Sequence, residues 1–323
     1  MTKNHSVGVI FEDDFHYLDH LAPLCSLLEI PLLVTDCDLY ELGKKLYPNL
    51  HISFVSLSDV GEILTKNFQK IYYCFTSDFL DQYLGIYQLY TPNSWEKIWC
   101  PHGYSEKDNY DGFAKEKKVL FYGKEMQTRL KEKNFSFSSH FLGNYRAYYF
   151  CKHINFYRNL LQDRLSFLEK KPTILYAPTW EDGENSFSFA KLNSLLEKLP
   201  FSFNWIIKLH PNTIKSNLIE IEQLKGKYEK NTIHFLEDFT PVYPLLDRVD
   251  GLMGDSSSIC YDMLFFPQKP LFFFTENRLQ IHKMGTKITE EDLQSFAILW
   301  EKCQIPNKHL EESKKDYYFS IFS

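Results

Sequence analysis

A serine-rich segment, residues 254–260, has the residue types and spacing to hold an anion. It reads Gly-Asp-Ser-Ser-Ser-Ile-Cys and follows an apolar run that is typical of a buried strand. Helical spacing after it predicts a helix over 259–266, with Ser256 and Ser257 at its start. Main-chain N–H groups at a helix start are unpaired and carry partial positive charge, which favours a phosphate. The alternative is an ordinary helix cap, in which Asp255 or Ser256 satisfies the helix's own amides.

A histidine at another predicted strand end is suited to proton transfer. His102 follows the apolar residues 97–100 and lies between Pro101 and Gly103, where the backbone can bend and expose the imidazole. Histidine is the side chain best able to accept a proton near neutral pH. His102 is therefore a candidate general base, with a loop histidine bonded to nearby main chain as the alternative.

Two further predicted strands end in polar residues, Thr179 after the first and Lys208 with His210 at the end of the second. Lys208 and His210 are two residues apart and share one face of an extended segment. Together with the serines, these side chains could hold a diphosphate. The alternatives are a simple turn at Thr179 and, for Lys208, a solvated side chain or one paired with Glu181 or Asp182.

These strand ends belong to two series of alternating strands and helices. Such alternation predicts parallel sheets covered on both faces, with ligands beyond the carboxyl ends of the strands. We therefore predict an α/β fold with two Rossmann-like domains facing across a cleft, residues 1–145 and 146–323. The strands are expected at 7–11, 31–34, 52–55, 70–75, 97–100, 118–122 and 140–142, and then at 173–177, 203–209, 232–235, 249–253 and 270–274.

Composition narrows the class of protein. The chain has 323 residues, 44% of them hydrophobic and 24% charged, which suits a globular protein of two domains. A net charge of -6 argues against nucleic acid as a partner. Seven cysteines without a CxxC pair indicate reduced thiols rather than disulfides or zinc. The polar start and the absence of an apolar run of about 20 residues favour a cytoplasmic protein.

Four segments in order resemble the motif set of the CDP-glycerol glycerophosphotransferase family, the enzymes of teichoic-acid priming and polymerisation. They are Pro101-His102-Gly103, Tyr176-Ala177-Pro178-Thr179-Trp180, Lys208-Leu209-His210-Pro211 and Gly254-Asp255-Ser256-Ser257-Ser258, with Asp262 downstream. The resemblance covers about residues 95 to 275. It implies a GT-B fold, with the acceptor on the side of the N-terminal domain and the nucleotide donor bound by the C-terminal domain.

The resemblance also implies a reaction at phosphorus. An acceptor hydroxyl would attack the β-phosphate of a CDP-linked polyol such as CDP-glycerol, and CMP would leave. His102 and His210 would be catalytic, and the donor-binding residues would be Thr179, Lys208, His210, Ser256, Ser257 and Asp262. Asp262 would meet a ribose or polyol hydroxyl, or would be an exposed helix carboxylate. No cofactor is certain, and the need for a divalent metal is open. Asp36-Cys37-Asp38 is a formal metal motif, but its two acids are better explained by a helix start.

The sequence is compatible with other functions. Glu181 and Asp182 stand where the family usually has arginine, so the donor could be another nucleotide-linked group. The same scaffold suits a nucleotide-sugar glycosyltransferase or epimerase, or a catalytically degenerate binding protein. Basic and aromatic residues over 145–167 and 314–323 suit a lipid-linked acceptor and peripheral contact with the inner face of the membrane. The alternative for both stretches is packing within the protein.

Overall fold

The computed structural model describes residues 6–12, 15–90, 95–106, 115–133, 138–166, 169–180, 191–229, 232–237, 239–274 and 279–303. These residues form two compact units. The first contains the described residues up to Tyr104 and from 115 to Lys152. The second contains Ser105, Glu106 and the described residues from His153 onward.

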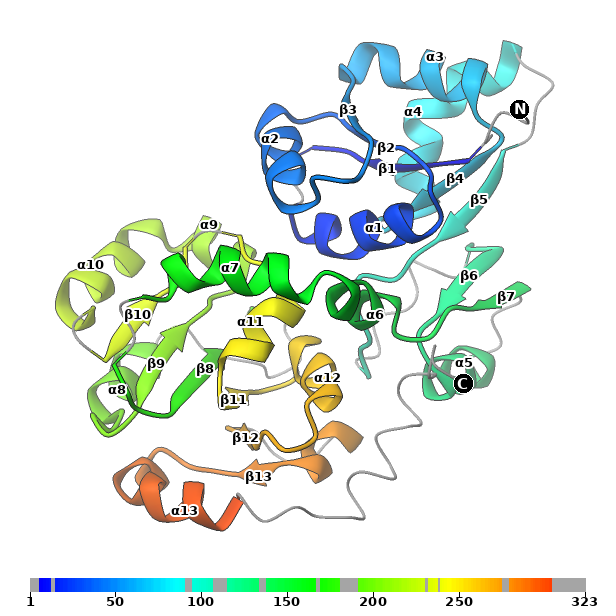
Figure 1. Ribbon diagram of the computed structural model, residues 1–323. Helices are drawn as coiled ribbons and strands as arrows, with labels where there is room; N and C mark the ends of the chain where they lie inside the picture. Colours follow the sequence, from blue (N-terminus) through cyan, green and yellow to red (C-terminus); the bar gives the residue numbers. More distant parts are fainter. Residues whose placement is uncertain are drawn as a thin grey trace. The chain divides into compact units, whose positions relative to one another are not determined.

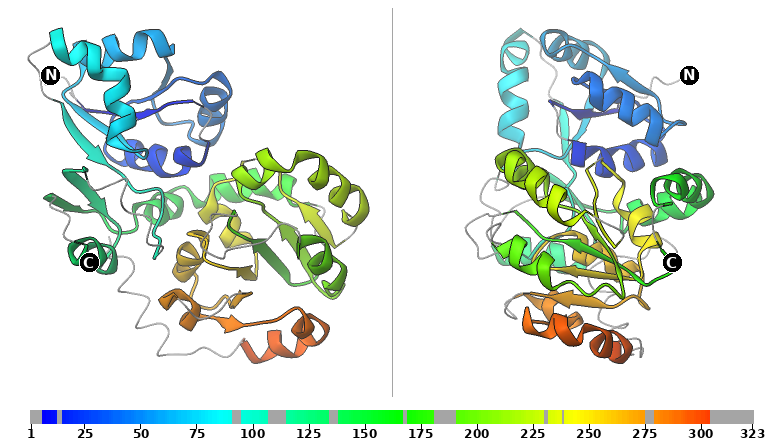
Figure 2. Two further views of the ribbon diagram at one scale, coloured as in Figure 1. Left: turned by 180° about the vertical axis from the view of Figure 1, so that it is seen from behind. Right: turned by 90° about the vertical axis from the view of Figure 1, so that its left-hand side faces the viewer.

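In its described part, the first unit is a parallel sheet of 7 strands in the order β3-β2-β1-β4-β5-β6-β7 (Figure 1). Helices α1 and α2 pack together on one face, and α3 and α4 pack together on the other (Figure 2). The strands are β1 (Ser6–Ile10), β2 (Leu32–Val34), β3 (Ile52–Phe54), β4 (Lys70–Tyr73), β5 (Glu96–Trp99), β6 (Lys118–Phe121) and β7 (Ser138–Phe141). The helices are α1 (Phe15–Leu27), α2 (Cys37–Leu46), α3 (Leu57–Asn67), α4 (Ser77–Tyr90), α5 (Lys124–Glu132) and α6 (Tyr145–Lys152).

The second unit, as far as it is described, is a parallel sheet of 6 strands in the order β10-β9-β8-β11-β12-β13. Its strands are β8 (Thr173–Ala177), β9 (Asn204–Ile207), β10 (Ile233–Phe235), β11 (Gly251–Gly254), β12 (Leu271–Phe273) and β13 (Thr286–Lys287). Its α-helices are α7 (Ile154–Arg164), α8 (Leu192–Lys198), α9 (Pro211–Ser216), α10 (Leu218–Tyr228), α11 (Val242–Arg248), α12 (Ile259–Asp262) and α13 (Phe296–Cys303). Three short 3-10 helices are η3 (Met263–Phe265), η4 (Gln280–Met284) and η5 (Glu291–Ser295).

Burial explains why the sequences of the strands are continuous apolar runs. Every residue of β8, β9 and β11 is buried, as expected for strands with helices on both faces. One core cluster includes Trp205 of β9, Phe272 of β12 and Phe296 of α13. The predicted α/β alternation is therefore confirmed in both units.

Some boundaries differ from the expected ones. The stretch 145–164 is divided into α6 and α7, and α6 belongs to the first unit. An ion pair ties Arg146 of α6 to Asp19 of α1 within this unit, which extends to Lys152. The helix expected over 259–266 is a single α-helical turn, α12, continued by η3.

Candidate functional site

The corner after β5 carries His102 at the carboxyl edge of the first sheet. His102 is exposed, and Gly103 has a φ of 97°, a conformation that favours glycine. The neighbouring strand β4 ends at Tyr73, and the main chain of the next residue, Cys74, is hydrogen-bonded to His102. The sequence prediction that Pro101 and Gly103 present the imidazole at a sharp corner is consistent with this geometry.

Three rings from α1 surround His102. Its ring centre lies 5.6 Å from that of His16, 5.5 Å from that of Tyr17 and 6.5 Å from that of His20. These neighbours replace part of the surrounding water, and desolvation lowers the pKa of His102 from its ordinary value of 6.5. The hydrogen bond with Cys74 acts in the opposite direction. A neutral imidazole at physiological pH is the form that can accept a proton.

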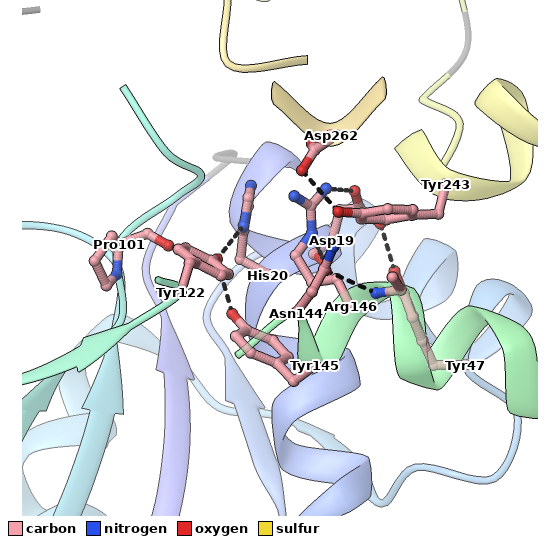
Figure 3. A network of polar contacts seen from close by, with 11 residues as sticks. Asp19, His20, Tyr47, Pro101, Tyr122, Asn144, Tyr145, Arg146, Tyr243 and Asp262 are labelled. Carbon is pink, nitrogen blue, oxygen red and sulfur yellow. Dashed lines mark hydrogen bonds and ion pairs between the residues drawn. The ribbon is translucent and has the colours of Figure 1, made fainter. Parts of the chain in front are cut away.

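A buried polar network lies beneath this corner (Figure 3). The Tyr122 hydroxyl, after β6, is 2.8 Å from the carbonyl oxygen of Pro101, 3.1 Å from His20 Nδ1 and 3.0 Å from the Tyr145 hydroxyl. The two tyrosine rings are stacked, with centres 5.5 Å apart. The network thus joins α1, β6 and α6 to the residue that precedes His102.

Arg146 anchors the same network. Its guanidinium is paired with the Asp19 carboxylate, and its Nε donates to the Asp19 carbonyl oxygen at 3.0 Å. The Tyr47 hydroxyl also donates to Asp19, at 3.2 Å. Burial first, and then the positive charge of Arg146, lower the pKa of His20 well below 6.5. Arg146 therefore has a structural partner on α1.

In the second unit, β9, β8 and β11 are adjacent, so the segments that follow them meet at one edge of the sheet. The main-chain N–H of Lys208 donates to the Tyr176 carbonyl oxygen at 2.9 Å. The rings of Trp180 and His210 are stacked, with centres 6.0 Å apart. Thr179 is buried, whereas Lys208, His210, Ser256 and Ser257 are half-buried. The structure thus gathers these predicted donor-binding residues at one sheet edge, and their roles stay predictions.

His210 has a defined tautomer. It occupies the N-cap position of α9, and its Nδ1 accepts the Asn212 main-chain N–H at 3.1 Å. A neutral imidazole that accepts at Nδ1 carries its proton on Nε2. His210 is therefore built to donate a hydrogen bond, which suits a phosphate ligand better than proton abstraction.

The serine turn, residues 254–260, contains a carboxylate, Asp255, that accepts main-chain hydrogen bonds. Its buried carboxylate accepts the main-chain N–H of Thr179 at 3.0 Å and that of Ser257 at 3.1 Å. Two main-chain N–H groups at this edge thus donate to a carboxylate of the protein itself. This arrangement resembles the alternative of an ordinary helix cap. Helix α12 is only 4 residues long, so any anion here depends on side-chain hydroxyls more than on a helix dipole.

Gly254 and His282 support this turn. A Cβ atom at Gly254 would lie 2.9 Å from Cys260 Sγ, so any larger residue would force the Cys260 side chain to shift. His282 of η4 is buried, and its Nε2 lies 3.1 Å from the Asp255 carbonyl oxygen. Its Nδ1 lies 3.4 Å from the Leu279 main-chain N–H, so Nε2 carries the proton and donates. The sequence analysis missed His282, because no motif marks a histidine in an irregular segment.

Asp262 is buried and accepts a hydrogen bond from the Tyr243 hydroxyl at 2.9 Å (Figure 3). The alternative of an exposed helix carboxylate was therefore wrong, because α11 packs against α12 and covers this side chain. One of its oxygens is occupied by Tyr243. A contact with a ribose or polyol hydroxyl stays a prediction.

The remaining candidates have ordinary structural contacts or lie elsewhere. Asp36 caps α2, with its Oδ1 2.7 Å from the Leu39 main-chain N–H, as the helix-start alternative proposed. Within the described ranges no cluster of His, Cys, Asp or Glu is arranged to hold a metal ion. Glu181 and Asp182 lie outside the described residues.

The basic stretch 145–167 uses its arginines within the protein. Arg158 pairs with Asp247, and Arg164 Nη1 lies 3.2 Å from the Phe239 carbonyl oxygen. With Arg146 also paired, packing accounts for these side chains better than a lipid surface does. The predicted tail 314–323 lies outside the described residues. Every helix in the described part of the chain is too short or too polar to cross a bilayer.

Comparison with known proteins adds two findings. The sequence model of the family described as CDP-Glycerol:Poly(glycerophosphate) glycerophosphotransferase matches residues 114–289. No curated protein matches the chain. Among solved structures, the wall teichoic acid polymerase TagF is similar with a TM-score of 0.65 and 14% identity, over 97% of this chain and 84% of that one.

Two structures of other activities share the architecture. HepE from Anabaena in complex with UDP-glucose is similar with a TM-score of 0.54 and 10% identity, over 97% of this chain and 91% of that one. The UDP-GlcNAc 2-epimerase from Neisseria meningitidis is similar with a TM-score of 0.56 and 13% identity, over 96% of this chain and 97% of that one. At these identities the likeness establishes the fold alone, and the predicted GT-B class is confirmed.

Proposed function

Because this chain belongs to the CDP-glycerol:poly(glycerophosphate) glycerophosphotransferase family, we propose that it transfers a polyol phosphate from a CDP-linked donor to an acceptor hydroxyl and releases CMP. The family assignment makes it a transferase of this type. The identity of the polyol and of the acceptor is the part that we propose. The observation that carries the proposal is the convergence of the predicted donor-binding segments at the carboxyl edge of β9, β8 and β11.

The reaction needs one proton acceptor and several fixed donors. The acceptor oxygen forms a bond to the β-phosphorus while the bond from that phosphorus to the oxygen bridging to the α-phosphate breaks, and CMP leaves with the electron pair. His102 takes the proton of the attacking hydroxyl. Phosphoryl transfer depends mainly on positioning and on stabilising charge, which fixed donors supply.

The second unit supplies those donors in this proposal. The Nε2–H of His210 and the hydroxyls of Ser256 and Ser257 donate to the diphosphate, with Thr179 and Lys208 beside them. Lys208 contributes positive charge. Asp262 contacts a hydroxyl of the ribose or the polyol.

The nucleotide-sugar alternatives have no observation of their own in favour of them. The likeness to HepE and to the 2-epimerase is one of fold, at identities of 10% and 13%. A degenerate binding protein likewise has no observation of its own in favour of it.

The test is to incubate the purified protein with CDP-glycerol, CDP-ribitol and UDP-sugars, each with and without a polyol acceptor, and to follow nucleotide release. We expect acceptor-dependent release of CMP that is lost in His102→Ala. Release of UDP would instead indicate a glycosyltransferase or epimerase. No nucleotide release with any donor would indicate a binding protein.

A lipid-linked acceptor and peripheral contact with the inner face of the membrane are further proposals. They are motivated by the aromatic and basic composition of 314–323, because the arginines of 145–167 have partners within the protein. Flotation with anionic liposomes tests them directly. Protein that stays at the bottom of the gradient at low salt would remove the membrane contact.

A further inference from the structure

The hydroxyl of Tyr122 fixes the proton of its neighbour His20. A phenol has one proton to donate and can accept two hydrogen bonds. The Pro101 carbonyl oxygen, 2.8 Å away, can only accept, so it receives the proton of Tyr122. His20 Nδ1, at 3.1 Å, and the Tyr145 hydroxyl, at 3.0 Å, must therefore donate to the Tyr122 oxygen. The hydrogen bonds are all satisfied only when His20 carries its proton on Nδ1.

The other nitrogen of His20 then carries a lone pair. Nε2 lies on the side of the ring that points away from Tyr122 (Figure 3). Burial is the largest cause that lowers the pKa of His20, followed by the charges of Arg146 from α6, His102 from the corner and His16 from its own helix. Tyr122 is a further titratable neighbour. Asp19, the adjacent carboxylate, is engaged by Arg146. His20 is thus a neutral hydrogen-bond acceptor that keeps 7% of its surface exposed.

His102 offers a second lone pair beside it. Its hydrogen bond with the Cys74 main chain raises its pKa, so the ring donates its N–H there and leaves the other nitrogen bare. The ring centres of His20 and His102 are 6.5 Å apart. At that separation the nitrogens are farther apart than the roughly 3 Å of a direct hydrogen bond, yet hydroxyls on adjacent carbons can reach both rings.

We propose that His20 and His102 together recognise two neighbouring hydroxyls of the acceptor. The reacting hydroxyl gives its proton to His102 as its oxygen bonds to phosphorus, and the adjacent hydroxyl donates a hydrogen bond to His20 Nε2 and is chemically unchanged. The acceptor class is therefore a polyol end with hydroxyls on adjacent carbons. This assignment rests on the proposed function and makes His20 a specificity-determining residue, whereas His102 is the base.

Two variants separate the two nitrogens of His20. In His20→Asn the amide N–H takes the place of Nδ1–H and keeps the bond to Tyr122, but nothing replaces Nε2. Tyr122→Phe keeps the ring and removes the hydroxyl that fixes the tautomer. The control is His51→Asn, the same exchange at an exposed histidine of the same unit. Circular dichroism and thermal melting establish that each variant is folded.

The experiment compares two acceptors that differ by one hydroxyl, glycerol 3-phosphate and 3-hydroxypropyl phosphate, with CDP-glycerol as donor and kcat/KM for CMP release as the readout. We expect the wild type and His51→Asn to prefer glycerol 3-phosphate by about 10-fold, the effect of one hydrogen bond. In His20→Asn we expect a ratio near one, with the activity on 3-hydroxypropyl phosphate retained. Tyr122→Phe should also lower the ratio.

An unchanged ratio in His20→Asn, or no preference in the wild type, would overturn the assignment while leaving the transferase activity standing. If His20→Asn does not fold, an unchanged ratio in Tyr122→Phe has the same meaning. Absence of CMP from the wild type with both acceptors and every CDP-linked donor would overturn the proposed function itself, and this assignment with it.

Discussion

His102 and His210 are the same residue at similar places, each just beyond the carboxyl end of a buried parallel strand, and their surroundings prepare them for opposite tasks. His102 is hydrogen-bonded to the main chain of Cys74, and desolvation keeps its pKa low. His210 accepts the Asn212 N–H on Nδ1, so its proton is on Nε2. In the proposed reaction we therefore expect the first imidazole to take a proton and the second to give a hydrogen bond. The local main-chain partner, rather than the residue type, would then set the role.

The largest effect is expected for His102→Ala. Loss of a general base should lower kcat/KM for CMP release by about 10³-fold. Donor binding, measured by calorimetry with CDP-glycerol, should change little, because we assign the donor to the second unit. A variant that keeps more than a tenth of the activity would show that His102 is not the base.

His210→Ala should have the next largest effect, a loss of about 10²-fold in kcat, because a hydrogen-bond donor to the developing charge is removed. His210→Gln should recover most of the activity, since its amide N–H can reach the place of Nε2–H. The measurement is the initial rate of CMP release at saturating donor. Equal losses in both variants would mean that His210 accepts a proton after all.

Main-chain contacts also stabilise the turn after β11, where the Asp255 carboxylate accepts main-chain N–H groups. Asp255→Ala leaves the N–H groups of Thr179 and Ser257 without this carboxylate, and the free energy of unfolding should fall by about 2 kcal/mol. Asp250→Ala is the matched control, because its carboxylate also accepts one main-chain N–H, that of Thr173 at 2.8 Å, but is exposed. Urea denaturation of both variants measures the difference. Equal destabilisation would show that burial of Asp255 is unimportant.

The smallest expected effect is on pH dependence. Only unprotonated His102 can act as a base, and its pKa is lowered, so kcat/KM should hold down to pH 6.5 and decline below it. The midpoint of this acid limb should be the same in the wild type and in His210→Gln. A midpoint above 6.5, or one that moves in His210→Gln, would contradict the assignment of roles.

The fold could be predicted from the sequence because buried parallel strands are apolar throughout and the helices between them have regular spacing. Thr173–Ala177 was predicted with its observed bounds. β13 was not predicted, since its 2 residues are too few to show any periodicity. The ion pair of Arg146 with Asp19 joins residues far apart in the chain, and no local pattern reveals it.

The candidate site was predictable only in part. Motif segments placed His102, Thr179, Lys208, His210 and the serines after strands, and the parallel sheets brought their neighbours together. His20 is four residues after His16, between the predicted strands 7–11 and 31–34, and on a helix this spacing puts both on one face and could have indicated its place. His282 and the carboxylate contacts of Asp255 depend on irregular backbone, for which the sequence offers no comparable signal.

The close packing of Gly254 against Cys260 restricts how this turn can change in evolution. A side chain at 254 would bring a Cβ atom to 2.9 Å from Cys260 Sγ. The Cys260 side chain would then have to shift, so a substitution at one of these two positions changes the packing of the other.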